Sequence, residues 1–248
     1  CLRIFPGLIV CVLFCIFVLG PWLTSLPLKQ YFAHEATWNY LRNIGLYITF
    51  YLPGVFEHGR VPNAVNGSLW SLPLEFFLYF VVAVLGLIST KKWITIATFL
   101  TSALLYLCWA QSATEMLVVY GTDLRQLFIN GTYFWAGAVF YQLNLKRYFS
   151  ITSVVLAGVG MLCIQTHFPQ YLFLTGWFLL PLIVLAFGLS TNEVLTRITA
   201  TGDYSYGVYL YAFPVQQTIA FFYPHLNFGT YVALCIAVTL GFAILSWH

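Results

Sequence analysis

Long stretches without charge constrain the fold of this chain more than any other feature. About 20 helical residues cross the hydrocarbon core of a bilayer. Backbone groups in lipid must be hydrogen-bonded within the segment, and no alternating strand pattern suggests a barrel. The sequence therefore predicts an all-α, polytopic transmembrane helix bundle. Its eight apolar runs are 7–28, 69–88, 93–110, 127–145, 150–166, 168–190, 204–222 and 226–247.

A ninth segment, 38–53, is shorter and contains Arg42 and Asn43. It could cross the membrane, re-enter it or lie along the interface. We therefore expect about eight to nine membrane segments in one membrane-embedded domain, 1–248. Because the chain starts at Cys1 and stops at His248 inside an apolar run, we expect a piece of a longer protein, truncated at both ends.

Composition excludes a soluble globular domain, because 61% of the residues are hydrophobic and only 7% are charged, whereas soluble domains carry about 25% charged residues. Nucleic acid is not implied as a partner. The six cysteines show no Cys-x-x-Cys spacing, so we interpret them as packing residues and predict no metal site. Tryptophans near the run ends are interfacial anchors; they are Trp22, Trp38, Trp93, Trp109 and Trp247.

Basic residues in the short connections indicate the orientation. Lys91 and Lys92, Lys146 and Arg147, and Arg197 fall on one side if each intervening run crosses once. The excess of Lys and Arg marks that side as the cytoplasm. The same residues would suit a phosphate-bearing nucleotide or anionic lipid headgroups, but topology alone accounts for them.

One acid, Glu75, lies just inside the run 69–88. A carboxylate at membrane depth costs about 2.5 to 3.5 kcal/mol, so we expect Glu75 to face the bundle interior and to mark a site. Ser71, Glu75 and Tyr79 follow at helical spacing and form a polar stripe. We expect Ser68 to cap this helix and Pro73 to bend it. A structural acid bonded to another helix is the alternative for Glu75.

The run 204–222 also carries polar groups, with Asp203 as its expected N-cap. Its tyrosines could line a sugar or pantetheine path, or bond between helices; they include Tyr206, Tyr209 and Tyr211. Every histidine before the last residue falls in a loop, so none is assigned as a general base. Asn66-Gly67-Ser68 matches a glycosylation sequon, but turn or cap chemistry is the favoured interpretation.

Four strings in the right order give the chain a family resemblance. They are Arg3-Ile4-Phe5-Pro6, the stretch from Asn66 to Tyr79 that starts Asn-Gly-Ser-Leu-Trp-Ser-Leu, Phe134-Trp135-Ala136-Gly137, and Ser205-Tyr206-Gly207-Val208-Tyr209-Leu210-Tyr211. Together they resemble the acyltransferase 3 family of bacterial integral-membrane O-acyltransferases, which modify O-antigens, exopolysaccharides and related glycans. The second string is the most specific.

The resemblance implies an enzyme of the bacterial inner membrane, surrounded by membrane lipid. It would have no bound cofactor and would use acyl-CoA, in the first place acetyl-CoA, as co-substrate. The acceptor would be a hydroxyl of a glycan or lipid-linked sugar. Glu75 is the candidate catalytic residue. The candidate substrate-binding residues are Arg3, which would hold the anionic donor, and Asn66, Trp70, Ser71, Tyr79, Tyr206 and Tyr209.

Two departures from the family pattern matter. The catalytic histidine of the family lies on a helix upstream of the Arg-Ile-x-Pro segment, and that helix is missing from this chain. Ala212 stands where many members have a second His. We therefore expect the fragment to be inactive alone. The rival hypotheses are a transporter or flippase for a glycan or lipid-linked sugar, although no repeated halves are evident, and a partner subunit without chemistry.

Overall fold

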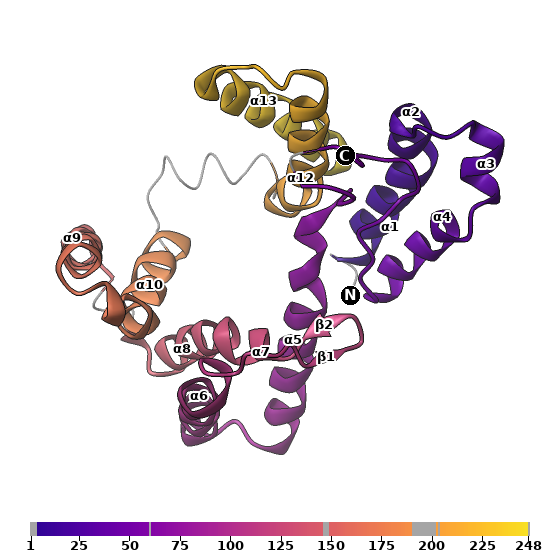
Figure 1. Cartoon of the computed structure of the whole chain (residues 1–248). Helices are drawn as coiled ribbons and strands as arrows, with labels where there is room; N and C mark the ends of the chain where they lie inside the picture. The colour runs from indigo at the N-terminus through magenta and orange to yellow at the C-terminus, as the bar shows by residue number, and fades with distance from the viewer. Residues whose placement is uncertain (1–3, 60, 146–148, 190–201, 203, 248) are drawn as a thin grey trace. The chain divides into compact units, whose positions relative to one another are not determined.

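The structure, a computed structural model, describes residues 4–59, 61–145, 149–189, 202 and 204–247 (Figure 1). Helices make up most of these residues, beside a single two-stranded hairpin, which confirms the all-α prediction. The chain divides into two compact units, Cys1–Pro73 with Arg197–His248, and Leu74–Thr196. The basic residues Lys146, Arg147 and Arg197 lie outside the described part of the chain.

Within the described residues, five helical stretches are long and apolar enough to cross a membrane. They are Phe5–Leu23, Gly67–Ile88, Lys92–Ala110, Pro169–Gly188 and Phe228–Trp247. Each falls on a run expected from the sequence. The protein is therefore a membrane protein built from helices.

Three of the remaining runs differ from a long apolar helix. The run 150–166 forms the shorter helix α9 (Ile151–His167). The run 127–145 is divided at Asn130 into α7 (Arg125–Ile129) and α8 (Gly131–Gln142). The run 204–222 is one helix, α12 (Ser205–Phe222), but its tyrosines and glutamines make it less apolar than the five candidate spans.

The segment 38–53 does not form a crossing helix. Helix α4 (Glu35–Asn39) passes into the 3₁₀ helix η2 (Tyr40–Gly45), which stops where Leu46 takes a left-handed conformation with φ of 62°. The helical part is too short for a bilayer core of about 30 Å at about 1.5 Å per residue. Buried Asn43 holds this bend, because its amide donates to the carbonyl oxygens of Tyr40 and Thr49 at 2.9 and 3.0 Å.

In the first unit, a nearly continuous helical stretch begins at Phe5. It consists of α1 (Phe5–Phe14), a π-helical turn η1 (Cys15–Leu19) and α2 (Gly20–Leu23), followed by the short helix α3 (Leu28–Ala33). Gly20 is needed here, because a Cβ at this position would lie 2.0 Å from the hydroxyl oxygen of Tyr31. That hydroxyl donates to the carbonyl of Ile16 at 3.0 Å.

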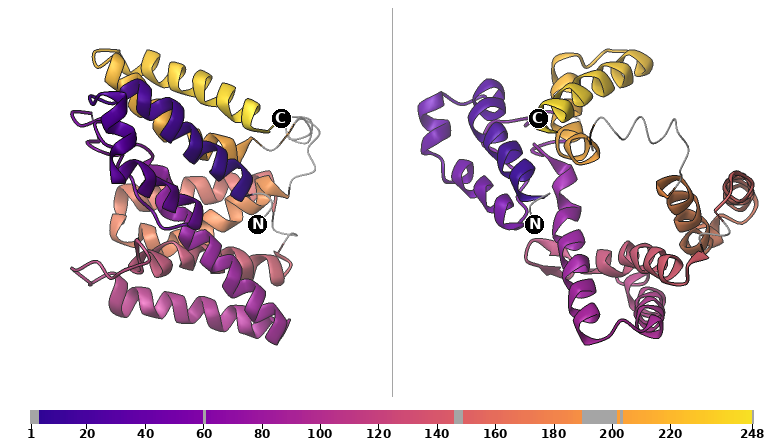
Figure 2. Two further views of the ribbon diagram at one scale, coloured as in Figure 1. Left: turned by 90° about the vertical axis from the view of Figure 1, so that its right-hand side faces the viewer. Right: turned by 180° about the vertical axis from the view of Figure 1, so that it is seen from behind.

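Helix α12 is the centre of the first unit. It packs along α13 (Phe228–Trp247) and also contacts α1 and the 3₁₀ turn η3 (Gly67–Ser71), as Figure 2 allows the reader to follow. The approach to α13 is close, since a Cβ on Gly207 would lie 2.8 Å from the Cα of Ala243. Small residues at such a crossing let two membrane helices come together.

In the second unit, α5 (Leu72–Ile88) leads to α6 (Lys92–Leu105), which continues as the π-helical turn η4 (Tyr106–Ala110). Helices α6 and α8 pack together, α8 packs on α10 (Leu172–Gly188), and α10 packs on α9. Their shared core contains Tyr106 and Trp177, with the ring of Phe173 stacked on Tyr106 at 4.5 Å between centroids. The hydroxyls of Ser102 and Thr132 join α6 to α8 at 2.8 Å.

A β-hairpin after η4 was not expected from the sequence. Strands β1 (Val118–Val119) and β2 (Thr122–Asp123) pair antiparallel around Tyr120 and Gly121, whose φ angles are 53° and 73°. Positive φ at both central residues is the geometry of a tight type I′ hairpin turn. Arg125 closes its base, with Nη2 at 2.7 Å from Oδ2 of Asp123.

Candidate active site

The start of α5 is fixed by a buried asparagine. The Oδ1 of Asn66 accepts a hydrogen bond from the backbone N–H of Ser68 at 3.2 Å, while its Nδ2 donates to the carbonyl of Leu210 at 2.8 Å. The side chain is fully buried. Asn66 is thus a cap, as the cap interpretation of this sequon predicted.

The expectation that Ser68 caps this helix is wrong. The 3₁₀ turn η3 precedes α5, so the cap moves upstream to Asn66. Pro73 does not break α5, which runs from Leu72 to Ile88. Pro73 is the second residue of that helix, where a backbone N–H would have no intrahelical partner and its loss costs little.

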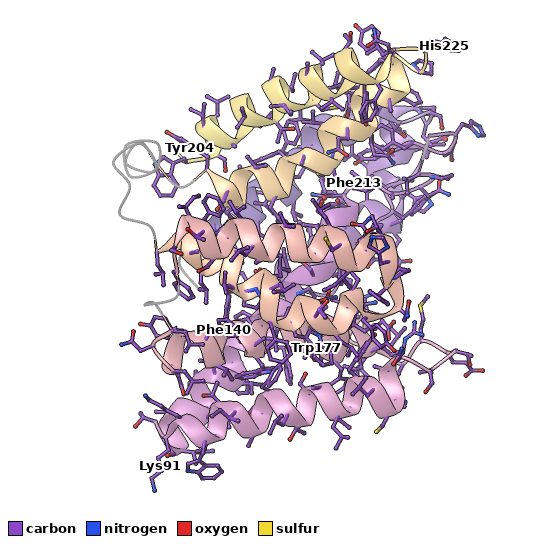
Figure 3. All side chains as sticks on the ribbon, turned by 90° about the vertical axis from the view of Figure 1, so that its left-hand side faces the viewer. Lys91, Phe140, Trp177, Tyr204, Phe213 and His225 are labelled. Carbon is purple, nitrogen blue, oxygen red and sulfur yellow. The ribbon has the colours of Figure 1, made fainter. Side chains whose placement is uncertain are left out.

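Tyr209 on α12 holds the same turn from the other side. Its hydroxyl donates to the carbonyl oxygen of Ser68 and lies 3.0 Å from the Oγ of Ser71. Phe213, one turn further along α12 (labelled in Figure 3), covers Gly67 so closely that a Cβ there would lie 2.6 Å from the ring. The turn that leads into α5 is therefore pinned by hydrogen bonds and by packing.

Tyr206 reaches a different segment from the same helix. Its hydroxyl donates to the carbonyl of Ile4 at 2.9 Å, and a Cβ on Gly7 would lie 3.1 Å from its ring. The rings of Tyr206 and Tyr209 stack with centroids 6.4 Å apart and planes 14° apart. Neighbouring tyrosines of α12 thus hold Ile4 of the Arg-Ile-x-Pro segment and the turn η3 that leads into α5. Arg3 itself, like the expected cap Asp203, lies outside the described residues.

Glu75 lies in the first turn of α5, where a negative charge is favoured by the helix dipole. Its side chain is exposed. Leu74 and Leu78 supply the buried face of this part of the helix.

The three residues of the expected polar stripe have different surroundings. Ser71 lies in the first unit and bonds to Tyr209, whereas Glu75 and Tyr79 lie in the second unit. The Tyr79 ring, 47% exposed, packs against Phe134 at 6.0 Å between centroids. Trp70 is 42% exposed. The structure thus brings together Asn66, Ser71 and Tyr209, with Tyr206 beside Tyr209.

Three further groups of α12 were not assigned to this site from the sequence. The carbonyl of Leu210 accepts from Asn66, the ring of Phe213 covers Gly67, and the Nε2 of Gln217 donates to the carbonyls of Val61 and Ala64 at 2.7 and 2.9 Å. With Tyr206 they fall on one face of α12 at helical spacing. A glutamine in the middle of an apolar run was the available signal, since such a group needs a partner.

No metal-binding cluster forms in the part of the chain that the structure describes, where no three or more His, Cys, Asp or Glu side chains gather. Cys11, Cys15 and Cys235 are buried and free, while Cys108 and Cys163 are exposed and free. The described cysteines are therefore not joined in disulfides. The polar groups at the site are hydroxyls, amides and one carboxylate, which suit binding and proton handling.

Fold and site together define a helical integral-membrane protein in which one helix, α12, holds both sequence segments of the candidate site. The family model described as "Acyltransferase domain" matches residues 1–247, and the chain belongs to this acyltransferase 3 family. The protein is thus an enzyme that transfers acyl groups. It is also similar to an "O-acetyl transferase" of Shigella phage Sf6, at 28% identity over 99% of this chain and 72% of the relative. No solved structure matches the chain.

Proposed function

We propose that this protein is an O-acyltransferase of the bacterial inner membrane. It moves an acyl group, in the first place acetyl, from acyl-CoA to a hydroxyl of a cell-surface glycan or lipid-linked sugar. The single observation that carries the proposal is the family match over residues 1–247, and the name of the phage relative supports the oxygen acceptor. We further propose that the whole chain acts as one domain with about eight membrane segments, because the ninth expected segment, 38–53, does not form a crossing helix.

The reaction requires a nucleophilic oxygen and an acid or base group. The acceptor oxygen attacks the thioester carbonyl, a C–O bond forms, the C–S bond breaks, and the thiol of CoA leaves with a proton from the hydroxyl. In our proposal Glu75 orients or relays this proton. Its exposure leaves the carboxylate open to a substrate.

Arg3 is proposed to hold the anionic donor, since a guanidinium binds phosphate in a bidentate manner. The neighbouring Ile4 is held by Tyr206, which supports a fixed position for this segment. Trp70 and Tyr79 are exposed aromatic side chains, suited to contact a sugar or pantetheine. Asn66, Ser71, Tyr206 and Tyr209 use side-chain polar groups within the protein, so we propose that they shape the site.

The test is acetyl transfer from labelled acetyl-CoA to membrane glycan by the full-length protein in its membrane. Glu75→Gln removes the charge and keeps the shape, so we expect transfer to be abolished while the amount of folded protein stays the same. The matched control is Glu115→Gln, which changes an exposed acid in the loop before β1. Full transfer by Glu75→Gln would remove Glu75 from the mechanism.

The same membranes also test the transporter hypothesis. Accumulation of a lipid-linked sugar in vesicles, with no consumption of acetyl-CoA by the unaltered protein, would contradict the proposed function. A partner subunit would show neither flux nor transfer. Each hypothesis thus predicts a different pair of results.

A further inference from the structure

A groove lies in the second unit between α5 and α6. Its volume is about 520 Å³, within the range of about 300 to 1,000 Å³ of typical ligand sites. On α6 it follows the stripe that starts at Trp93 and ends at Leu105, and on α5 it is bounded by Phe77, Leu78 and Val81. At about 1.5 Å per residue, the α6 stripe is about 18 Å long.

The groove wall is largely hydrocarbon, and its three hydroxyl side chains are Thr98, Thr101 and Ser102. None of its lining side chains is charged. The hydroxyl of Thr98 donates to the carbonyl of Ile94 at 2.9 Å, and that of Ser102 is bonded to Thr132 at 2.8 Å. A sugar or a peptide would leave polar groups unpaired in such a groove, whereas an alkyl chain would not.

One end of the groove is basic. Lys91 and Lys92 are both exposed at the start of α6, and Figure 3 shows the Lys91 side chain pointing away from the ribbon. Trp93, the next residue, lines the groove and is 62% exposed. Neither lysine forms an ion pair with a residue that the structure describes. This order of lysines, tryptophan and groove matches that of a lipid in a bilayer. The paired lysines would meet the headgroup, the tryptophan would lie at the interface, and the apolar groove would hold the acyl chain.

We propose that this groove binds an anionic phospholipid, with its phosphate at Lys91 and Lys92 and one acyl chain along α6 from Trp93 to Leu105. Positive charge in a short connection is expected from topology alone. What selects a lipid here is charge complementarity at the mouth of an uncharged groove, which runs along two helices apolar enough to cross the membrane.

The first experiment measures the thermal unfolding midpoint of the detergent-purified protein with added phosphatidylglycerol or phosphatidylcholine of identical chains. A ligand that binds only the folded state raises the midpoint. We expect a larger rise with phosphatidylglycerol, lost in the double variant Lys91→Gln, Lys92→Gln. The control is Lys29→Gln, an exposed lysine on α3 outside the groove, which should keep the full rise.

The second experiment fills the groove while both lysines remain. Ala97→Phe places a ring in the α6 wall and should abolish the rise with phosphatidylglycerol. The matched control is Ala83→Phe, at an exposed position of α5 that does not line the groove. If Ala97→Phe does not fold, the proposal is tested by quenching of tryptophan fluorescence with phosphatidylglycerol that carries brominated chains. Quenching should be stronger than with brominated phosphatidylcholine, and this difference should disappear in Trp93→Phe.

Three results would overturn this proposal. Equal rises with the two lipids would show a nonspecific effect of hydrocarbon. An unchanged rise in the double lysine variant would place the headgroup elsewhere. A rise of the unfolding midpoint with acetyl-CoA that depends on the two lysines, without any rise with lipid, would instead make the lysines a binding site for the acyl donor. Acyl transfer is not measured in these experiments, so failure of the proposed function would leave their outcome unchanged.

Discussion

The hydroxyl oxygen of Tyr209 lies 3.0 Å from the hydroxyl oxygen of Ser71, although 138 positions separate them in the chain. The same tyrosine donates to the carbonyl of Ser68. Both partners belong to the turn that leads into α5, and Glu75 follows Ser71 by four residues. Tyr209 thus restrains the local start of the helix that carries the candidate catalytic acid.

Replacing Tyr209→Phe removes these hydrogen bonds and keeps the ring. We expect kcat for acyl transfer to fall roughly tenfold, since about 1.4 kcal/mol of lost positioning changes a rate by that factor. KM for acetyl-CoA should stay the same, because the hydroxyl serves the protein and not the donor. The matched control is Tyr211→Phe, whose ring stacks on Phe242 at 5.3 Å. A rise in KM at constant kcat would instead make Tyr209 a donor-binding residue.

Asn66→Asp separates a structural role from a binding role for this side chain. Aspartate can still accept from the N–H of Ser68, but it cannot donate to the carbonyl of Leu210. The buried carbonyl of Leu210 would keep only the thiol of Cys11 as a donor, with Sγ at 3.6 Å. A thiol is a weak donor, so we expect a cost of about 1 to 3 kcal/mol, to which the nearby negative charge adds. We expect a lower thermal unfolding midpoint even without substrate. An unchanged midpoint together with lost activity would show that Asn66 binds substrate.

Gly67→Ala should destabilise the protein by about 1 to 3 kcal/mol, the usual cost of overpacking. The added Cβ would lie 2.6 Å from the ring of Phe213. A second change, Phe213→Leu, should recover part of the loss by making room. Gly86→Ala on α5 is the control, because its Cβ would meet nothing within 4 Å, and it should be neutral or stabilising. No recovery in the double variant would exclude the Phe213 contact as the cause.

The ion pair at the base of the hairpin predicts a pH dependence. The side-chain hydrogen bond from Arg125 holds the pKa of the Asp123 carboxyl below its usual value. A lowered pKa in the folded state stabilises the hairpin above the ordinary aspartate value of about 3.9, and this contribution is lost as the pH falls through the lowered value. We therefore expect the hairpin to be indifferent to pH between neutrality and about 5.

Selective ¹³C labelling of aspartate carboxyls measures this directly, because the chain has two aspartates and Asp123→Asn assigns the signals. The Asp123 signal should titrate below the usual range and return towards it in Arg125→Gln. Titration at the ordinary aspartate value in the unaltered protein would contradict the ion pair seen in the structure.

Much of the architecture is contained in local sequence. The five candidate spans fall on expected runs, because a stretch of about 20 apolar residues in lipid has no alternative to a helix. Trp22 and Trp93, which we predict to be interfacial anchors, are 63% and 62% exposed. The residues near Glu75 were identified from the continuous sequence string Asn66 to Tyr79. Such a string can be compared with a family motif without knowledge of the fold.

Local sequence could not fix how the polar groups pair. Ser68 and Asn66 are both good caps, and only the distant carbonyl of Leu210 makes Asn66 the buried one. Hydropathy also does not predict that the run 127–145 is divided at Asn130 or that helix η2 ends at Gly45. It is averaged over a window of residues and does not report breaks in the backbone. The β-hairpin depends on an ion pair and on two residues with positive φ.

The sequence by itself determined that the chain is a helical membrane protein of the acyltransferase 3 family, since apolar length and a string of neighbouring residues are local properties. The tertiary structure decided what each polar side chain does. Tyr206, Tyr209 and Asn66 are occupied by backbone and side-chain partners that lie more than 130 residues away in the chain, such as Ile4, 202 residues from Tyr206, and Leu210, 144 from Asn66. Hydrogen bonds reach only about 3 Å, so the fold alone selects these partners.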